Sequence, residues 1–297
     1  MKLSVHYTPK MLANADSYSP SAGKPALVMA SWAESGLPLN IIEPPPVSVD
    51  QFSLAHDRAF VEGVLSGGIN NGFGNTLPSV AASLPYTSGV MLSAARAALT
   101  NQRGAIAPCS GFHHAGYDTD GGFCTFNGLM VTAAVLLAES KVHKIGILDC
   151  DQHWGNGTQD IIDRLCLGDR VVHYSPCRAF GRTQRAEAFL AMLPQLLTTF
   201  ADCDLVLYQA GADPHINDPL GGWLTTEQLY RRDARVFDGL RKMCIPVAWN
   251  LAGGYQRDAA GTIRPVLTIH DNTLHAFAEC WGVEAACREN CESALSA

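Results

Sequence analysis

The stretch KIGILDCDQH, from Lys144 to His153, decides the fold class. Its first half is a short apolar run, which is typical of a strand buried on both faces of a parallel sheet. Its second half places two aspartates and a histidine directly after that run. Ligands of open parallel sheets bind beyond the carboxyl ends of the strands, so residues 149–153 are expected to face a functional site.

Similar apolar runs recur after Gly104, separated by amphipathic helical patterns. The expected strands are Ala105–Ala107, Lys144–Asp149, Arg170–Tyr174, Asp204–Gln209 and Ile245–Leu251. The expected helices between them are Gly128–Glu139, Arg185–Phe200 and Thr226–Met243, with Thr225 or Thr226 as an N-cap. This alternation predicts an α/β protein, a three-layer αβα sandwich around a central and mainly parallel sheet.

The first hundred residues are less regular, with helices expected at Lys24–Ser35, Ala55–Ser66 and Ser88–Asn101. The segment Gly67–Tyr86 is rich in Gly, Asn and Ser and is predicted to be a long loop, serving as a lid or a pocket wall. No internal repeat or linker divides the chain, so residues 1–297 are expected to form a single catalytic domain.

The composition excludes several classes of protein. Hydrophobic residues make up 47% of the 297 residues and charged residues 16%, which is typical of a globular chain. The net charge of −7 lacks the basic footprint that direct nucleic-acid binding needs. No apolar run is long enough to span a membrane, and the first residues lack a signal-peptide core, so a cytoplasmic protein is expected. The ten cysteines are predicted to be reduced thiols, and a metal knuckle at Cys287 and Cys291 is disfavoured.

Metal binding is one interpretation of the residues at the strand ends. Asp151 and His153 are two positions apart and point the same way on extended backbone, and Asp213 follows another expected strand. Three ligands of nitrogen and oxygen type leave a position open for water, as in catalytic zinc sites. The alternative is that these residues cap the following helix and hydrogen-bond one another.

Two further strand ends carry groups suited to hydrolysis. His113 and His114 could divide the roles of base and acid beside a metal-bound water, although adjacent histidines can also be structural. Tyr255 follows two glycines and could donate a hydrogen bond to an oxyanion, or it could be a packed aromatic residue. The convergence of these groups on successive strand ends favours a hydrolase.

The chain resembles the zinc-dependent histone deacetylases and their bacterial relatives, the acetylpolyamine amidohydrolases and acetoin-utilisation proteins. The resemblance rests on five motifs in order, which are SGFHHA (110–115), GGFCTFNG (121–128), DCDQHWGNGTQ (149–159), GADPHINDPLGG (211–222) and LAGGYQRD (251–258). It implies the arginase/deacetylase fold and a Zn²⁺ ion bound by Asp151, His153 and Asp213. Trp154 departs from the family pattern, which has a second histidine there.

The resemblance also implies roles for other residues. His114 would be the general acid/base with His113 supporting it electrostatically, Asp149 would orient His113, and Tyr255 would hydrogen-bond the substrate carbonyl. Asn156, where some relatives have an aspartate, should give His114 a lower pKa than a carboxylate would. A potassium site is implied at Asp149 and Ser175, with backbone oxygens of Asp151 and His153. The implied channel residues are Gly122, Phe123, Phe180 and Leu220.

The leading hypothesis is therefore a zinc-dependent deacylase of lysine side chains in proteins or peptides, from a bacterium. The nearest alternative keeps the chemistry and changes the substrate to an acylated polyamine or another small amide. A ureohydrolase with two manganese ions is disfavoured because that family resembles D-x-H-x-D rather than the D-x-D-x-H of Asp149–His153. A non-catalytic protein that binds acyl-lysine is disfavoured because the ligands and Tyr255 are all present.

Overall fold

The apolar run after Lys144 forms strand β4 (Ile145–Asp149), and every residue of this strand is buried. The computed structural model describes residues 2–283, in which β4 belongs to a seven-stranded sheet with the order β2-β1-β3-β7-β6-β4-β5. All neighbouring strands pair in parallel. The other strands are β1 (Leu3–His6), β2 (Leu39–Ile42), β3 (Gly104–Ala107), β5 (Val171–Tyr174), β6 (Leu205–Gly211) and β7 (Val247–Ala252).

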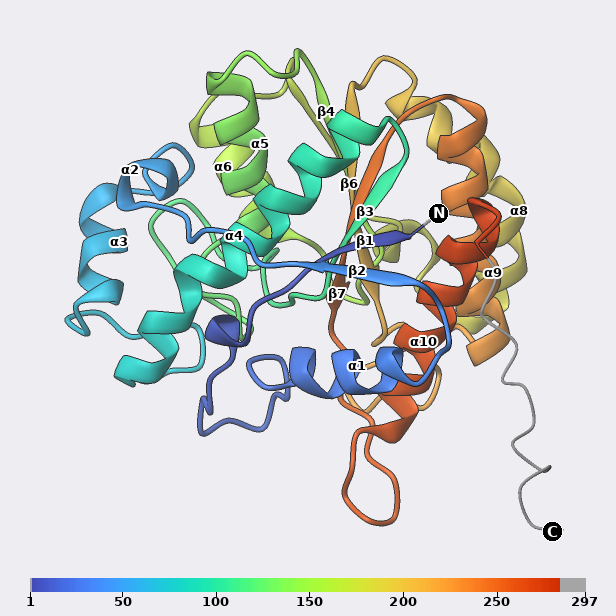
Figure 1. The fold of residues 1–297 in the computed structure, drawn as a ribbon, viewed down its shortest axis with the longest axis horizontal. Helices are drawn as coiled ribbons and strands as arrows, with labels where there is room; N and C mark the ends of the chain where they lie inside the picture. Colours follow the sequence, from blue (N-terminus) through green and yellow to red (C-terminus); the bar gives the residue numbers. More distant parts are fainter. Residues whose placement is uncertain (1, 284–297) are drawn as a thin grey trace, which may run out of the picture.

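Helices cover both faces of this sheet (Figure 1). One face carries α1 (Lys24–Ala33), α8 (Ala186–Leu197), α9 (Thr226–Lys242) and α10 (Arg264–Cys280). The other carries α2 (Val49–Phe52), α3 (Arg58–Leu65), α4 (Pro78–Asn101), α5 (Gly128–Ala138) and α6 (Asn156–Arg164). Short helical segments are α7 (Cys177–Phe180), η1 (Pro9–Met11), η2 (Thr183–Arg185) and η3 (Thr198–Phe200). A separate apolar core fills each side, which confirms the predicted three-layer sandwich.

The strand register brings polar residues together at the carboxyl edge of the sheet. Asp149 on β4 pairs with Gln209 on β6, which pairs with Asn250 on β7. The chain segments that follow these strands therefore emerge side by side. This edge is where the sequence predicts the functional site.

The prediction of a loop over Gly67–Tyr86 is wrong in its second half. Helix α4 begins at Pro78, at a first-turn position that suits proline, and continues through Pro85. An internal proline costs a helix about 3 kcal/mol. Burial of much of α4, including Val80, Val90 and Met91, offsets that cost. The first half of the segment remains a loop, and its Phe73 ring lies 6.3 Å from the ring of Phe123.

The sequence also predicts strands, a helix cap and free cysteines. The five predicted strands are present with shifts of one or two residues at their ends, and Thr225 caps α9 in a capping box with Gln228. Strands β1 and β2 were not predicted. The cysteines among residues 2–283 are free thiols, and Cys287 and Cys291 lie outside the described residues. Within the described range, no helix combines the length and apolarity needed to cross a bilayer.

Candidate active site

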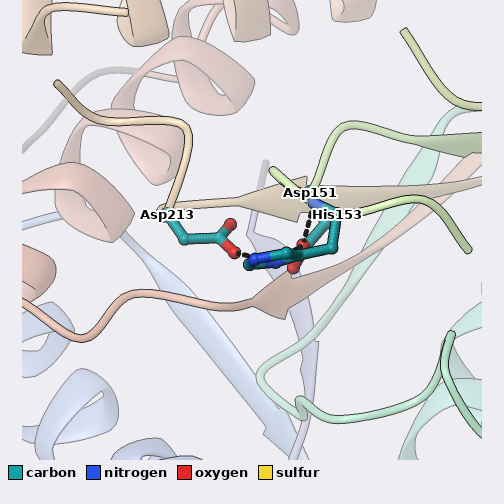
Figure 2. Close-up of side chains that lie close together, drawn as sticks. All are labelled: Asp151, His153 and Asp213. Carbon is teal, nitrogen blue, oxygen red and sulfur yellow. Dashed lines mark hydrogen bonds and ion pairs between the residues drawn. The ribbon is translucent and has the colours of Figure 1, made fainter. Parts of the chain in front are cut away.

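The three proposed metal ligands converge from the ends of neighbouring strands (Figure 2). Asp151 and His153 follow β4, and Asp213 follows β6. One ligand atom from each residue lies within 4.8 Å of the other two. Nδ1 of His153 is 3.2 Å from Oδ1 of Asp151 and 3.2 Å from Oδ2 of Asp213. The two aspartates are buried, whereas the His153 side chain is 38% exposed.

The electrostatics of this cluster favour a bound cation. Burial and the charge of Asp151 raise the pKa of Asp213 to about 7, because two carboxylates lie close together in the interior. The same carboxylates raise the pKa of His153 to about 10, so that its imidazolium supplies positive charge between them. Oδ2 of Asp213 is buried and makes no hydrogen bond of good geometry, although Nδ1 of His153 lies 3.2 Å away. A metal ion that displaced the His153 proton would satisfy all three groups, so these residues fit a zinc ion.

The two adjacent histidines lie beside this cluster, and their partners differ. Nδ1 of His113 is 2.7 Å from Oδ2 of Asp149, whereas Nδ1 of His114 is 2.6 Å from Oδ1 of Asn156. Burial would lower the pKa of His113, but the charges of Asp149 and Asp151 outweigh burial and raise it to about 9. Burial and the charge of His113 lower the pKa of His114. At neutral pH, His113 is therefore protonated and His114 is neutral.

A buried chain of hydrogen bonds fixes Asp149. Its Oδ1 accepts from Nε2 of Gln209 at 2.8 Å and from the Asp151 backbone N–H at 3.2 Å. Asn250 extends the chain, with Nδ2 at 3.4 Å from Oε1 of Gln209. Because Oδ2 of Asp149 faces His113, the sheet register itself orients the first histidine.

Tyr255 reaches the site through a tight turn after β7. Gly253 has a φ of +48°, and a Cβ there would lie 2.2 Å from Cγ of Asp213, so only glycine fits. The Tyr255 backbone N–H donates to Oδ2 of Asp218 at 2.8 Å. Burial raises the pKa of the Tyr255 hydroxyl, which keeps it a neutral donor. Tyr255 and His113 line the same narrow cavity.

The predicted channel residues lie in different surroundings, and only some of them line the cavity beside Tyr255. Gly122 and Phe123 line the cavity that holds His113 and Tyr255, and a Cβ at Gly122 would lie 2.3 Å from Cδ2 of His114. Phe123 lies 5.9 Å from the Tyr255 ring. Leu220 is exposed.

Phe180 departs from the expected channel position. It is buried in the core with its ring 5.5 Å from that of Phe189, because the short helix α7 turns its apolar side chain toward α8. It does not line the cavity that contains Phe123.

The remaining predicted residues flank the site. Ser175 is buried at the end of β5, with Oγ 3.3 Å from Sγ of Cys177. The Trp154 ring packs at a tilt against the His173 ring with centroids 5.0 Å apart, and the guanidinium of Arg178 lies 3.9 Å from the Trp154 ring centroid. The residue after His153 therefore contacts both an imidazole and a guanidinium.

Sequence reasoning missed two buried cations behind the site. Lys24 is 1% exposed, its Nζ donates to the Gly253 carbonyl, and burial lowers its pKa to about 8. Arg232 is also 1% exposed, and its Nη1 donates to the carbonyls of Cys150 at 3.2 Å and Gly211 at 2.8 Å. These carbonyls belong to the segments that carry the proposed metal ligands. The adjacent charges of Arg232 and Asp233 on an otherwise amphipathic helix were the available signal.

Comparisons with known proteins agree with this geometry. The sequence matches the histone deacetylase domain family over residues 21–175 and 172–268. The chain is 25% identical to a probable deacetylase of Methanothermobacter thermautotrophicus over 86% of each protein. It is 40% identical to acetylpolyamine amidohydrolase 1 of Pseudomonas aeruginosa, over 60% of this chain and 61% of the relative. It is 28% identical to histone deacetylase 2 of Arabidopsis thaliana, of which the chain spans 54%.

Solved structures show the same fold. The crystal structure of the HDA15 HD domain superposes with a TM-score of 0.73 and 19% identity, over 96% of this chain and 89% of that domain. The crystal structure of an acetylpolyamine aminohydrolase from Burkholderia pseudomallei gives 0.70 and 17%, over 94% and 99%. The fold is thus the arginase/deacetylase fold, as predicted. The chain belongs to the histone deacetylase domain family, which confirms the predicted deacetylase class of enzyme.

Proposed function

We propose that this protein is a zinc-dependent amidohydrolase that removes acyl groups from lysine side chains in proteins or peptides. The observation that supports it best is the convergence of Asp151, His153 and Asp213 beside the pair His113–His114. Zinc held by the three ligands would polarise the acyl carbonyl and lower the pKa of a water molecule. The chain acts as one catalytic domain in this proposal, and a bacterial, cytoplasmic enzyme stays a prediction from sequence.

The protein's own residues supply the proton transfers. His114 is neutral and donates Nδ1–H to Asn156, so its Nε2 is free to take a proton from water and give it to the leaving amine. His113 remains protonated beside Asp149 and stabilises negative charge that develops on the carbonyl. Tyr255 donates a hydrogen bond to the same oxygen. The Gly122 carbonyl accepts from the substrate amide, and Phe123 packs on the alkyl stem.

Potassium has a supporting place in the proposal. The side chains of Asp149 and Ser175 are both buried, and Asp149 accepts from the Asp151 backbone N–H. A K⁺ ion bound there, among oxygen atoms, would counter the charge of the aspartates behind the zinc site.

A second candidate substrate is an acylated polyamine. It is favoured by the 40% identity to acetylpolyamine amidohydrolase 1 of Pseudomonas aeruginosa. The residues and the chemistry of the site would be the same, and only the group beyond the scissile amide would differ.

A substrate panel tests the proposed function. Zinc-loaded protein is assayed on acetyl-lysine and longer acyl-lysine peptides and on N-acetylputrescine, with Tyr255→Phe as the variant. Removing the phenol should lower kcat by about 10²- to 10³-fold while zinc remains bound, because one donor to the developing oxyanion is lost. Hydrolysis of N-acetylputrescine alone would show that the substrate is a small amide. No hydrolysis of any substrate would favour a binding protein.

The Asn156 amide provides a pH test of the role of His114. Asn156→Asp should raise the pKa of His114 by about one to two units, because a carboxylate stabilises the imidazolium. A base must be neutral to act, so the acidic limb of kcat/KM should move to higher pH and activity at pH 6 should fall. The control Asn156→Ala adds no negative charge, so it should not move the acidic limb of kcat/KM to higher pH. An unchanged limb in Asn156→Asp would show that His114 is not the base.

A further inference from the structure

A second cavity of about 620 Å³ adjoins Tyr255 and is not used by the chemistry above. The loop after β6, the loop after β7 and the first turns of α9 and α10 form its walls, and Tyr18 from the N-terminal loop closes one side. The rings of Tyr18 and Tyr255 stack with centroids 6.2 Å apart. Because Tyr255 lines both cavities, the second cavity adjoins the one that contains His113.

The charges around this cavity are unusual for a protein with a net charge of −7. None of its lining residues is a carboxylate, and Arg257 is the only lining residue with a permanent charge. Both ring nitrogens of the lining His215 already have partners, since Nδ1 accepts from the Asn217 backbone N–H at 3.2 Å and Nε2 lies 2.9 Å from Oγ1 of Thr226. Asp218, in the same loop as His215, is 7% exposed, and its two oxygens accept from the backbone N–H groups of Leu220 and Tyr255.

The guanidinium of Arg257 is positioned but not neutralised. Its Nη1 donates to the Gly261 carbonyl at 2.9 Å, and its Nη2 lies 3.5 Å from the Tyr18 carbonyl. No ion pair between described residues includes Arg257. A further cavity of about 660 Å³ on the N-terminal side also contacts Arg257 and has no carboxylate in its lining. A cationic polyamine tail would meet an uncompensated positive charge here.

We propose that Arg257 and this cavity bind a carboxylate at the far end of the substrate, so that the enzyme prefers acyl-lysine bearing a free α-carboxylate. Such a substrate is free acyl-lysine or a peptide that ends in it. Arg257 supplies a fork of donors for the carboxylate, and the lining Asn217, Thr226 and Thr268 supply polar groups around it. The inference rests on the proposed deacylase function and names its substrate class.

Matched substrates test the proposal with zinc-loaded full-length protein. The three are Nα-blocked acetyl-lysine with a free carboxylate, its C-terminal amide, and N-acetylputrescine. The free acid should have a KM about tenfold lower than the amide, with similar kcat, since the carboxylate lies away from the reacting atoms. High salt should reduce this preference, because Arg257 is exposed to solvent.

Variants of Arg257 separate this role from folding. Arg257→Gln should remove the preference, Arg257→Lys should retain part of it, and Arg257→Glu should favour N-acetylputrescine over the free acid. Arg241→Gln removes an equal charge from the last turn of α9 and should change nothing. Turnover with equal KM for acid and amide, or a preference that survives in Arg257→Gln, would overturn the inference. No turnover of any substrate would contradict the deacylase function itself and the inference with it.

Discussion

Asp213→Ala is expected to abolish zinc retention and to lower kcat/KM on the order of a thousandfold or more. Asp213 is fully buried, and its Oδ2 makes no hydrogen bond of good geometry, although Nδ1 of His153 lies 3.2 Å away. In the variant, only Asp151 and His153 would remain of the three proposed ligands. Zinc content by mass spectrometry and steady-state hydrolysis of an acyl-lysine peptide measure the two effects together.

Asp258→Asn is the matched control for Asp213→Ala. Asp258 lies in the loop after Tyr255, and its carboxylate binds Thr262 and the Ala260 N–H rather than the cluster. An amide keeps most of those bonds, so zinc content and rate should stay at the wild-type level. A fully active Asp213→Ala protein with a normal zinc content would show that the metal lies elsewhere or is not needed.

Arg232→Met is expected to destabilise the fold by about 3–5 kcal/mol, because it leaves the buried carboxylate of Asp233 without its counter-charge. Arg232 also donates to the carbonyls of Cys150 and Gly211. The Asp233 carboxylate accepts from Nε of Arg232, from the Tyr208 hydroxyl and from Oγ1 of Thr273. Urea unfolding measures the loss of stability. Zinc affinity should also fall, since both clamped carbonyls adjoin the ligand-bearing segments.

Two further variants show whether charge is the cause. The double variant Arg232→Met with Asp233→Asn should recover part of the stability, because it removes the stranded negative charge. Arg231→Met, on the same helix, breaks only a surface pair with Glu187 and should cost at most about 1 kcal/mol. If the double variant is no more stable than Arg232→Met, the loss comes from packing rather than from the uncompensated charge.

The predictable parts of the fold are those set by local sequence. Strands β4, β6 and β7 are buried throughout, and their apolar runs are visible without a structure. Strand β2 is a partly exposed edge strand of four residues, so its sequence carries no such pattern. Helix α4 was shortened in prediction because Pro78 and Pro85 resemble loop residues until tertiary burial is known.

In the candidate site, too, some residues are predictable from local sequence and others are brought together only by the fold. Asp151, His153, Asp213 and the histidine pair follow strands directly, and parallel pairing brings strand ends together. Phe180 was misplaced, because the direction in which a short helix turns its side chain depends on its packing partners. The contacts of Lys24 with Gly253 and of Arg232 with two carbonyls join segments far apart in sequence, and no local spacing signals them.

The most direct test of the central claim is zinc titration of metal-free protein while hydrolysis of an acetyl-lysine substrate is followed. Activity should rise in proportion to bound zinc, saturate at a single ion per chain and be lost again on chelation. The Asp151→Ala protein should show no rise. Full activity without metal, or stoichiometric zinc binding with no hydrolysis of any acyl amide, would contradict the account.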